Sequence, residues 1–161
     1  FPVSVIKTID KKGIVVPAEF FESFGTLRLL DIFPLMMASM KRGATLLVDE
    51  LDASLHPMII MNFIKIFHND EINKNGAQLI FNTHNPIFLN KNLFRRDEIK
   101  FVEKEEKESI LYSLSDFGTS GKNGVRNGEN YLKNYFINKY GAITDVDFSD
   151  IFEEYMNQER K

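Results

Sequence analysis

The chain of 161 residues contains no cysteine, so neither a disulfide framework nor a cysteine-ligated metal site is available to it. It also lacks any apolar run of the roughly 18 residues that a membrane-spanning helix requires. Its N-terminus shows no signal-peptide pattern, and we expect a cytoplasmic protein without a membrane partner. The net charge of −3 does not indicate a nucleic-acid-binding surface, although such a total can hide a local basic patch.

A phosphate-binding motif is missing as well. No G-x-x-x-x-G-K-[S/T] P-loop occurs in the sequence. The glycine-rich stretch 118–128 contains Gly121-Lys122, but its spacing differs from that of a P-loop, and no Ser or Thr follows the lysine. No predicted strand leads through this stretch into a helix. We therefore interpret it as a loop.

The remaining pattern is that of one globular domain, 1–161, with alternating strands and helices. Continuous apolar runs are typical of parallel strands buried on both faces, and two of them follow helical stretches here. Pro34 should bend or interrupt the first helix. The expected elements are a hairpin (2–9 and 12–18), helices at 24–42 and 57–68, buried strands at 44–48 and 77–81, a short helical segment at 86–89, a second hairpin (99–103 and 109–114), and closing helices at 130–139 and 148–160.

The first long predicted helix, at 24–42, is dense in Leu, Ile and Met. We expect its large apolar side chains to lie in the core rather than in a binding site, and we expect the tyrosines near the C-terminus to pack against a sheet. The core candidates in this helix are Leu29, Leu30, Ile32, Phe33, Met36, Met37 and Met40; the tyrosines are Tyr131, Tyr135 and Tyr140.

Two carboxylates, Asp49 and Glu50, directly follow the first buried strand. Open α/β sheets place ligands at the C-terminal ends of their strands, and adjacent carboxylates are costly there unless they face a polar site. Nucleotide hydrolysis uses such a pair: one carboxylate holds Mg²⁺ through water, and the other orients or deprotonates the attacking water. The same pair could instead cap a helix or form a surface ion pair.

Two weaker signals flank this pair. Ser23 and Gly25 open the long helix, where backbone N–H groups can bind an anion, although a simple N-cap explains them equally well. His84 follows the second buried strand and could contact a phosphate or serve a purely structural role. Asp49 lies 26 residues after Ser23, and His84 lies 35 residues after Asp49. The order of the three signals strengthens each of them.

In this order the motifs resemble the head of an ABC-type ATPase. Ser23 and Gly25 match the serine and second glycine of the signature loop Leu-Ser-Gly-Gly-Gln. Asp49 and Glu50 match Walker B and the catalytic glutamate, residues 53–56 match the D-loop, and His84 matches the switch histidine. The sequence departs from the transporter pattern at Phe24, Thr26 and His56-Pro57.

These departures resemble a narrower branch, the AAA/ABC-like ATPases of bacterial defence, which includes OLD-type nuclease ATPases and abortive-infection ATP-binding proteins. The resemblance extends over about residues 19–143, through 92–102 and 131–143. It implies the C-terminal lobe of a P-loop NTPase, with residues 19–90 carrying the motifs and 91–161 forming a peripheral hairpin and closing helices. The lobe with Walker A is absent, and we expect it upstream of Phe1 in a longer protein.

The resemblance also implies a mechanism in which two protomers sandwich ATP and Mg²⁺. Asp49 would bind the metal, and Glu50 and His84 would be catalytic in the same protomer. The partner's nucleotide would be contacted by Ser23 and Gly25, with Thr26 and Arg28 as further candidates. Asp52, Ser54 and His56 would line the dimer interface and couple the two sites. A nuclease or toxin would be the effector. No role follows for Arg95 or Arg96.

Other functions remain open at this stage. The fold could be a catalytically inactive ATP-sensing or dimerisation module that controls a partner, although the presence of Glu50 argues against a pure scaffold. A DNA-repair clamp of the SMC type would need long heptad stretches, and none occurs here. We expect the isolated chain to bind ATP weakly and not to hydrolyse it.

Overall fold

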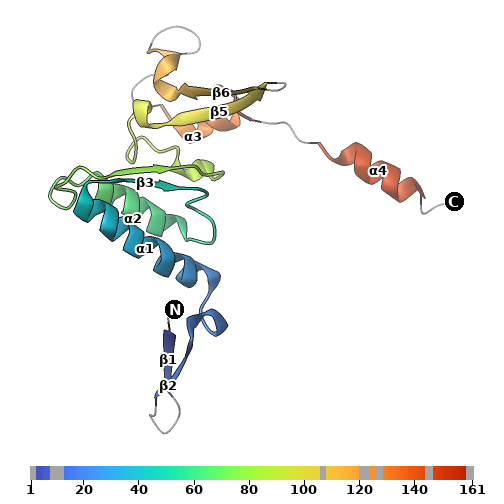
Figure 1. The fold of residues 1–161 in the computed structure, drawn as a ribbon. Coiled ribbons are helices and arrows are strands. Elements are labelled where there is room, and N and C mark those ends of the chain that lie inside the picture. The colour runs from blue at the N-terminus through green and yellow to red at the C-terminus, as the bar shows by residue number, and fades with distance from the viewer. Residues whose placement is uncertain are drawn as a thin grey trace. The chain divides into compact units, whose positions relative to one another are not determined.

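A computed structural model of the chain describes residues 3–7, 13–105, 108–119, 124–125, 129–143 and 147–158. The chain divides into two compact units, residues 1–89 and 90–161, and each unit is described by itself. The chain contains helices, a two-stranded parallel sheet and two antiparallel hairpins (Figure 1). This mixture agrees with the predicted α/β class. Among the described residues, no helix combines the length and the apolar character needed to cross a membrane.

The first unit begins with an antiparallel hairpin. Strand β1 (Val3–Lys7) pairs with β2 (Gly13–Pro17), and the short 3-10 helix η1 (Ala18–Phe20) follows. The hairpin is therefore confirmed. Of the turn predicted at residues 10–13, residues 10–12 lie outside the described residues and Gly13 begins β2.

Helix α1 (Phe24–Arg42) has the predicted bounds, and both ends have a physical cause. At its start, the Ser23 hydroxyl accepts a hydrogen bond from the Thr26 N–H at 3.1 Å, which satisfies one of the free donors of the first turn. At its end, Gly43 adopts the left-handed conformation with φ 65°. A Cβ at Gly43 would lie 2.4 Å from the carbonyl oxygen of Asn75, so both the backbone angle and the space require glycine.

Pro34 lies inside α1 and does not interrupt it, so the break that the sequence allowed is not found. A proline in a helix leaves the carbonyl four residues earlier, here that of Leu30, without its N–H partner. Both Leu30 and Pro34 are exposed, so water can reach that carbonyl.

A β–α–β arrangement follows α1. Strands β3 (Thr45–Val48) and β4 (Gln78–Phe81) pair in parallel, with Val48 opposite Phe81, and helix α2 (Pro57–Phe67) lies between them in sequence. Both α1 and α2 lie on the same side of this sheet (Figure 1). The buried apolar side chains of this unit are Ala18, Ile32, Met36, Leu51, Leu55, Ile60, Phe63, Ile64, Phe67, Ala77 and Phe88.

The two parallel strands are covered on one face only, which corrects the expectation that they are buried on both. Leu46 and Leu79 are partly buried, whereas Leu47 is 72% exposed and Ile80 is 55% exposed. The side chains of a strand alternate between its faces, and both helices pack on one of them. The apolar character of the two strands predicts a sheet that is covered on both faces, but the described residues pack on only one of them.

The packing of α1 also differs from the expectation. Ile32 and Met36 are buried, but Leu30, Phe33 and Met37 are each more than 40% exposed. Residues four apart lie on one face of a helix, so Ile32 and Met36 form the inner stripe. Leu30, Phe33 and Met37 lie outside this stripe, so they could be buried only if another layer packed against the outer side of α1.

The second unit contains the antiparallel hairpin of β5 (Lys100–Glu105) and β6 (Glu108–Ser113), the 3-10 helices η3 (Arg96–Glu98) and η4 (Leu114–Phe117), and the helices α3 (Tyr131–Phe136) and α4 (Ser149–Gln158). The second hairpin and both closing helices are thus confirmed, with α3 shorter than expected.

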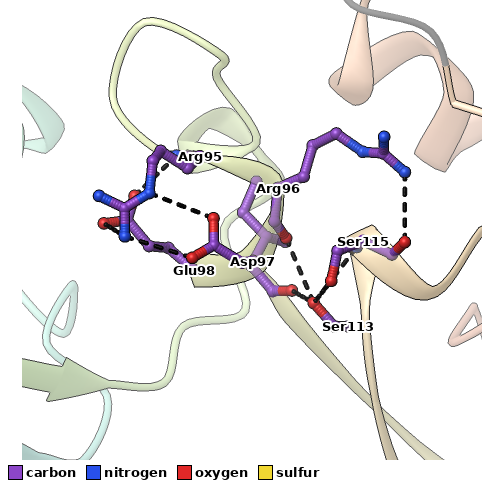
Figure 2. A network of polar contacts seen from close by, with 7 residues as sticks. Arg95, Arg96, Asp97, Glu98, Ser113 and Ser115 are labelled. Carbon is purple, nitrogen blue, oxygen red and sulfur yellow. Dashed lines mark hydrogen bonds and ion pairs between the residues drawn. The ribbon is translucent and has the colours of Figure 1, made fainter. Parts of the chain in front are cut away.

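Arg95 and Arg96 have different surroundings in this unit (Figure 2). Arg95 is exposed and pairs with the neighbouring carboxylates of Asp97 and Glu98, each at 3.2 Å. The guanidinium of Arg96 donates to the carbonyl oxygens of Leu114, Ser115 and Gly118, the last at 2.6 Å. Arg96 therefore fastens η3 to η4, which is a structural role.

An aromatic cluster forms the core of the second unit. Phe101 on β5 contacts the rings of Tyr112, Tyr135 and Tyr140, with centroids 5.4–6.1 Å apart. The Tyr112 hydroxyl donates to the carbonyl oxygen of Tyr140 at 2.7 Å. Tyr135 and Tyr140 therefore pack against the hairpin, as the sequence predicts.

Replacing Tyr112 with Phe should lower the free energy of unfolding by about 1 kcal/mol, because it deletes this hydrogen bond. Burial and the nearby Glu103 carboxylate raise the pKa of Tyr112 to about 12, above the value of 10 for an unfolded chain. The stability that depends on the neutral hydroxyl is therefore complete below pH 10 and is lost as the pH rises through about 12.

Chemical denaturation and the alkaline tyrosinate absorbance of Tyr112→Phe, compared with the wild type, would check this. The variant should lack the transition near pH 12. Tyr155→Phe, at an exposed position on α4, is the matched control and should leave that transition in place. Burial also raises the pKa of Tyr140, so the outcome that would contradict the assignment is a transition near pH 12 that keeps its full wild-type amplitude in Tyr112→Phe.

Candidate functional site

Asp49 and Glu50 come directly after β3, and His84 comes three residues after the end of β4. The parallel register brings these strand ends side by side, so the polar residues meet at one edge of the sheet. His84 Nε2 lies 3.7 Å from Glu50 Oε1. The two side chains are 90% and 58% exposed, so this edge is open to solvent.

Asn82 joins the two carboxylate residues, and sequence reasoning gave it no role. Its side-chain N–H donates to Asp49 Oδ1 at 2.6 Å, and its Oδ1 accepts from the backbone N–H of Glu50 at 2.5 Å. A signal for Asn82 was present in the sequence: Asp49 and Asn82 each directly follow a four-residue strand whose last three residues are apolar. Paired parallel strands of equal length place such residues next to each other.

The loop after Glu50 is held by buried leucines. Leu51 is fully buried and Leu55 is 6% exposed, while Ser54 between them is exposed. Glu50 and Ser54 have positive φ angles, 46° and 64°, which non-glycine residues seldom adopt. Such backbone strain persists only where the surroundings enforce it, and the two leucines supply that anchor.

Asp52 is half-buried in this loop, and its carbonyl oxygen accepts from the N–H of Leu55 at 3.3 Å. His56 is exposed and caps α2, because its Nδ1 accepts from the backbone N–H of Met58 at 3.2 Å. The imidazole thus accepts a hydrogen bond from one of the free N–H donors in the first turn of α2.

The start of α1 lies against the same loop. A Cβ at Gly25 would lie 2.5 Å from the carbonyl oxygen of Ser54, so only glycine allows this approach. The Ser23 hydroxyl caps α1 and also lies 3.0 Å from the Thr26 hydroxyl. Both hydroxyls are thus engaged within the first turn of α1, in the simple N-cap arrangement that the sequence left open.

Arg28 connects α1 to the carboxylate pair. Its guanidinium donates to the backbone carbonyl oxygen of Asp49 at 3.2 Å. Its Nε is buried and makes no hydrogen bond. The side chain is therefore engaged within its own chain, at the end of β3.

The candidate residues thus form two neighbouring groups. Asp49, Glu50 and His84 gather at the sheet edge, whereas Gly25 meets Ser54 at the start of α1. Arg28 links α1 to the first group. The Gly121-Lys122 pair that the sequence drew attention to lies outside the described residues.

The donor set at the sheet edge fits a metal that is shared with a ligand. Within the described ranges, no three His, Cys, Asp or Glu side chains form a group that could hold a metal alone. Mg²⁺ is commonly bound by one or two carboxylates, with phosphate oxygens and water completing its shell. Asp49 can supply one such oxygen, since the Asn82 amide engages its Oδ1 and leaves Oδ2 for a ligand. The residues present therefore fit Mg²⁺ that arrives with a nucleotide.

Comparison with known families gives a match over the first part of the chain. A family model described as "AAA domain, putative AbiEii toxin, Type IV TA system" matches residues 3–90, which is more than half of the chain and includes every residue of the two groups above. No curated protein and no solved structure matches the chain.

Proposed function

The chain belongs to this family of AAA-type domains, which are ATP-binding domains, and from that premise we propose that it hydrolyses ATP as part of a dimerising ABC-type ATPase of bacterial phage defence. The observation that carries the proposal is the approach of His84 to Glu50, at 3.7 Å, beside Asp49 at the open end of two parallel strands. A carboxylate for Mg²⁺, a carboxylate for water and a histidine for phosphate are the groups that this reaction needs at one place.

Asp49 would hold the metal through its free oxygen, and the metal would supply charge neutralisation on the phosphates. Glu50 would take the proton of the attacking water or orient it. His84, 3.7 Å from Glu50, would lie beside that carboxylate and hydrogen-bond the terminal phosphate.

The phosphate cradle would come from a polypeptide segment that is not among these 161 residues, because they contain no P-loop. The bare face of the β3–β4 sheet supports this part of the proposal. Parallel sheets are normally covered on both faces, and Leu47 and Ile80 leave one apolar face open. Neighbouring strands or a further layer from that segment would cover it.

Dimerisation would place the start of α1 against the nucleotide of the second protomer. The backbone N–H groups and small residues around Ser23 and Gly25 suit a phosphate at a helix N-terminus. Because Gly25 contacts the loop of Ser54, the signature segment and the D-loop would reach the interface as one unit. A nuclease or toxin would respond to closure of the dimer.

The experiment that tests the proposal compares the purified chain with the assembly that contains the P-loop segment. The chain alone should bind a fluorescent ATP analogue with a dissociation constant of about 1 mM or weaker. It should show no turnover, because the P-loop backbone and lysine supply most phosphate contacts. The assembly should bind in the micromolar range and hydrolyse ATP.

Micromolar binding or turnover by the chain alone would show that no outside P-loop is needed. Failure of both the chain and the assembly to bind ATP would overturn the proposed function as a whole.

A further inference from the structure

Asn82 makes three contacts with three consecutive residues of the candidate site. Besides the side-chain bonds to Asp49 and to the Glu50 N–H, its backbone carbonyl oxygen accepts from the N–H of Leu51 at 3.3 Å. The end of β4 is thereby fastened to the turn that follows β3. Only one orientation of the amide satisfies both side-chain bonds, with nitrogen toward the carboxylate and oxygen toward the N–H.

The turn that Asn82 fastens is a strained one. Glu50 has φ 46°, which costs a non-glycine residue free energy and is kept only when neighbouring contacts fix it. The bond from the Glu50 N–H to Asn82 is the shortest of these contacts at 2.5 Å, and the burial of Leu51 anchors the other side. Without the amide, the peptide that carries Glu50 would lose the restraint on this side of the turn.

The same amide orients Asp49. A donor at 2.6 Å on Oδ1 fixes the rotation of the carboxylate and leaves Oδ2 to point toward a ligand. An exposed carboxylate would otherwise sample several rotamers, and ordering it at the moment of metal binding costs free energy.

We propose that Asn82 is a positioning residue that holds Asp49 and Glu50 in the geometry required for Mg²⁺·ATP. The inference rests on the proposed function. Asn82 lies two residues before His84 in the segment that follows β4. Its bonds therefore also limit the movement of His84 relative to Asp49 and Glu50.

The first test measures nucleotide affinity rather than activity. In the assembly with the P-loop segment, the affinity for a fluorescent ATP analogue is measured with Mg²⁺ and with EDTA. Asn82→Ala should reduce the gain in affinity due to Mg²⁺ about tenfold and leave the affinity in EDTA unchanged. It should also lower kcat about tenfold. Asn62→Ala is the matched control, since the Asn62 side chain donates to the Met58 carbonyl oxygen within α2, and this variant should behave as the wild type.

Asn82→Asp separates the two contacts. Its carboxylate can still accept from the Glu50 N–H, but it cannot donate to Asp49 and places a like charge beside it. It should therefore lose at least as much of the Mg²⁺-dependent gain as Asn82→Ala while the Glu50 amide keeps its protection from hydrogen exchange.

Hydrogen exchange of the Glu50 amide, measured by NMR on the chain itself, needs neither nucleotide nor turnover. The amide should exchange slowly in the wild type and faster in Asn82→Ala. Exchange in the wild type at the rate of an unprotected amide would overturn the proposal even if the alanine variant does not fold. If the wild-type assembly gains no affinity from Mg²⁺, the proposed function fails; if wild type and Asn82→Ala gain equally, the inference on Asn82 alone fails.

Discussion

Glu50→Gln should reduce ATP turnover by the assembled protein by about 10²–10⁴-fold while nucleotide binding remains close to that of the wild type. The amide keeps the size of the side chain but cannot accept the proton of the attacking water. Glu50 is exposed, and in the described part of the chain its side chain pairs with His84 alone, so the substitution should leave the fold intact. Single-turnover hydrolysis and equilibrium binding of the same preparation would measure the two quantities separately.

Glu71→Gln is the matched control for this variant. Glu71 lies in the exposed loop between α2 and β4, and only its backbone N–H takes part in a described hydrogen bond, to Asn69. It should leave turnover unchanged. Hydrolysis by Glu50→Gln at the wild-type rate would mean that Glu50 is not the catalytic base and would favour the alternative of an ATP-sensing module.

Gly25→Ala should lower the free energy of unfolding by about 1–3 kcal/mol, which corresponds to several degrees in Tm for a chain of this size. The new methyl group would lie 2.5 Å from the carbonyl oxygen of Ser54, and that oxygen belongs to the backbone of a loop fixed by buried leucines. The start of α1 and the loop would have to move apart. Because the proposed signature segment lies here, turnover should fall as well.

The sign of the change in the free energy of unfolding separates the predicted clash from the effect of helix propensity. Helix propensity alone predicts that alanine in place of glycine stabilises α1 by about 1 kcal/mol. Thermal and chemical unfolding of the chain would therefore show a gain if the clash were absent and a loss if it is present. Adding Ser54→Gly should restore part of the stability, since glycine tolerates the φ of 64° at this position and lets the loop adjust.

Local signals in the sequence were sufficient for the elements of this fold. The ends of α1 follow from Ser23 and Gly43, whose chemistry acts within one turn of the helix. The two parallel strands follow from short apolar runs. The place of Asp49, Glu50 and His84 at one edge follows from the order of strands, because parallel strands end on the same side.

Properties that depend on the packing of one element against another could not be predicted from the sequence. The exposure of Leu30 and Leu47 depends on surfaces that the described residues do not provide. The continuity of α1 through Pro34 depends on which side of the helix faces water. The bridge from the Asn82 amide to Asp49 could be predicted only if the register of β3 and β4 were known to within one residue.

The one-sided sheet also bears on how an oligomer of this chain should be understood. Strands β3 and β4 form a two-stranded sheet among the described residues, so each is an edge strand, and the apolar side chains of Leu47 and Ile80 are exposed on it. Surfaces of this kind invite edge-to-edge pairing and aggregation. Self-association without nucleotide would therefore be attributed to the exposed edge and apolar face of the β3–β4 sheet. Only association that requires ATP would indicate a dimer that sandwiches the nucleotide.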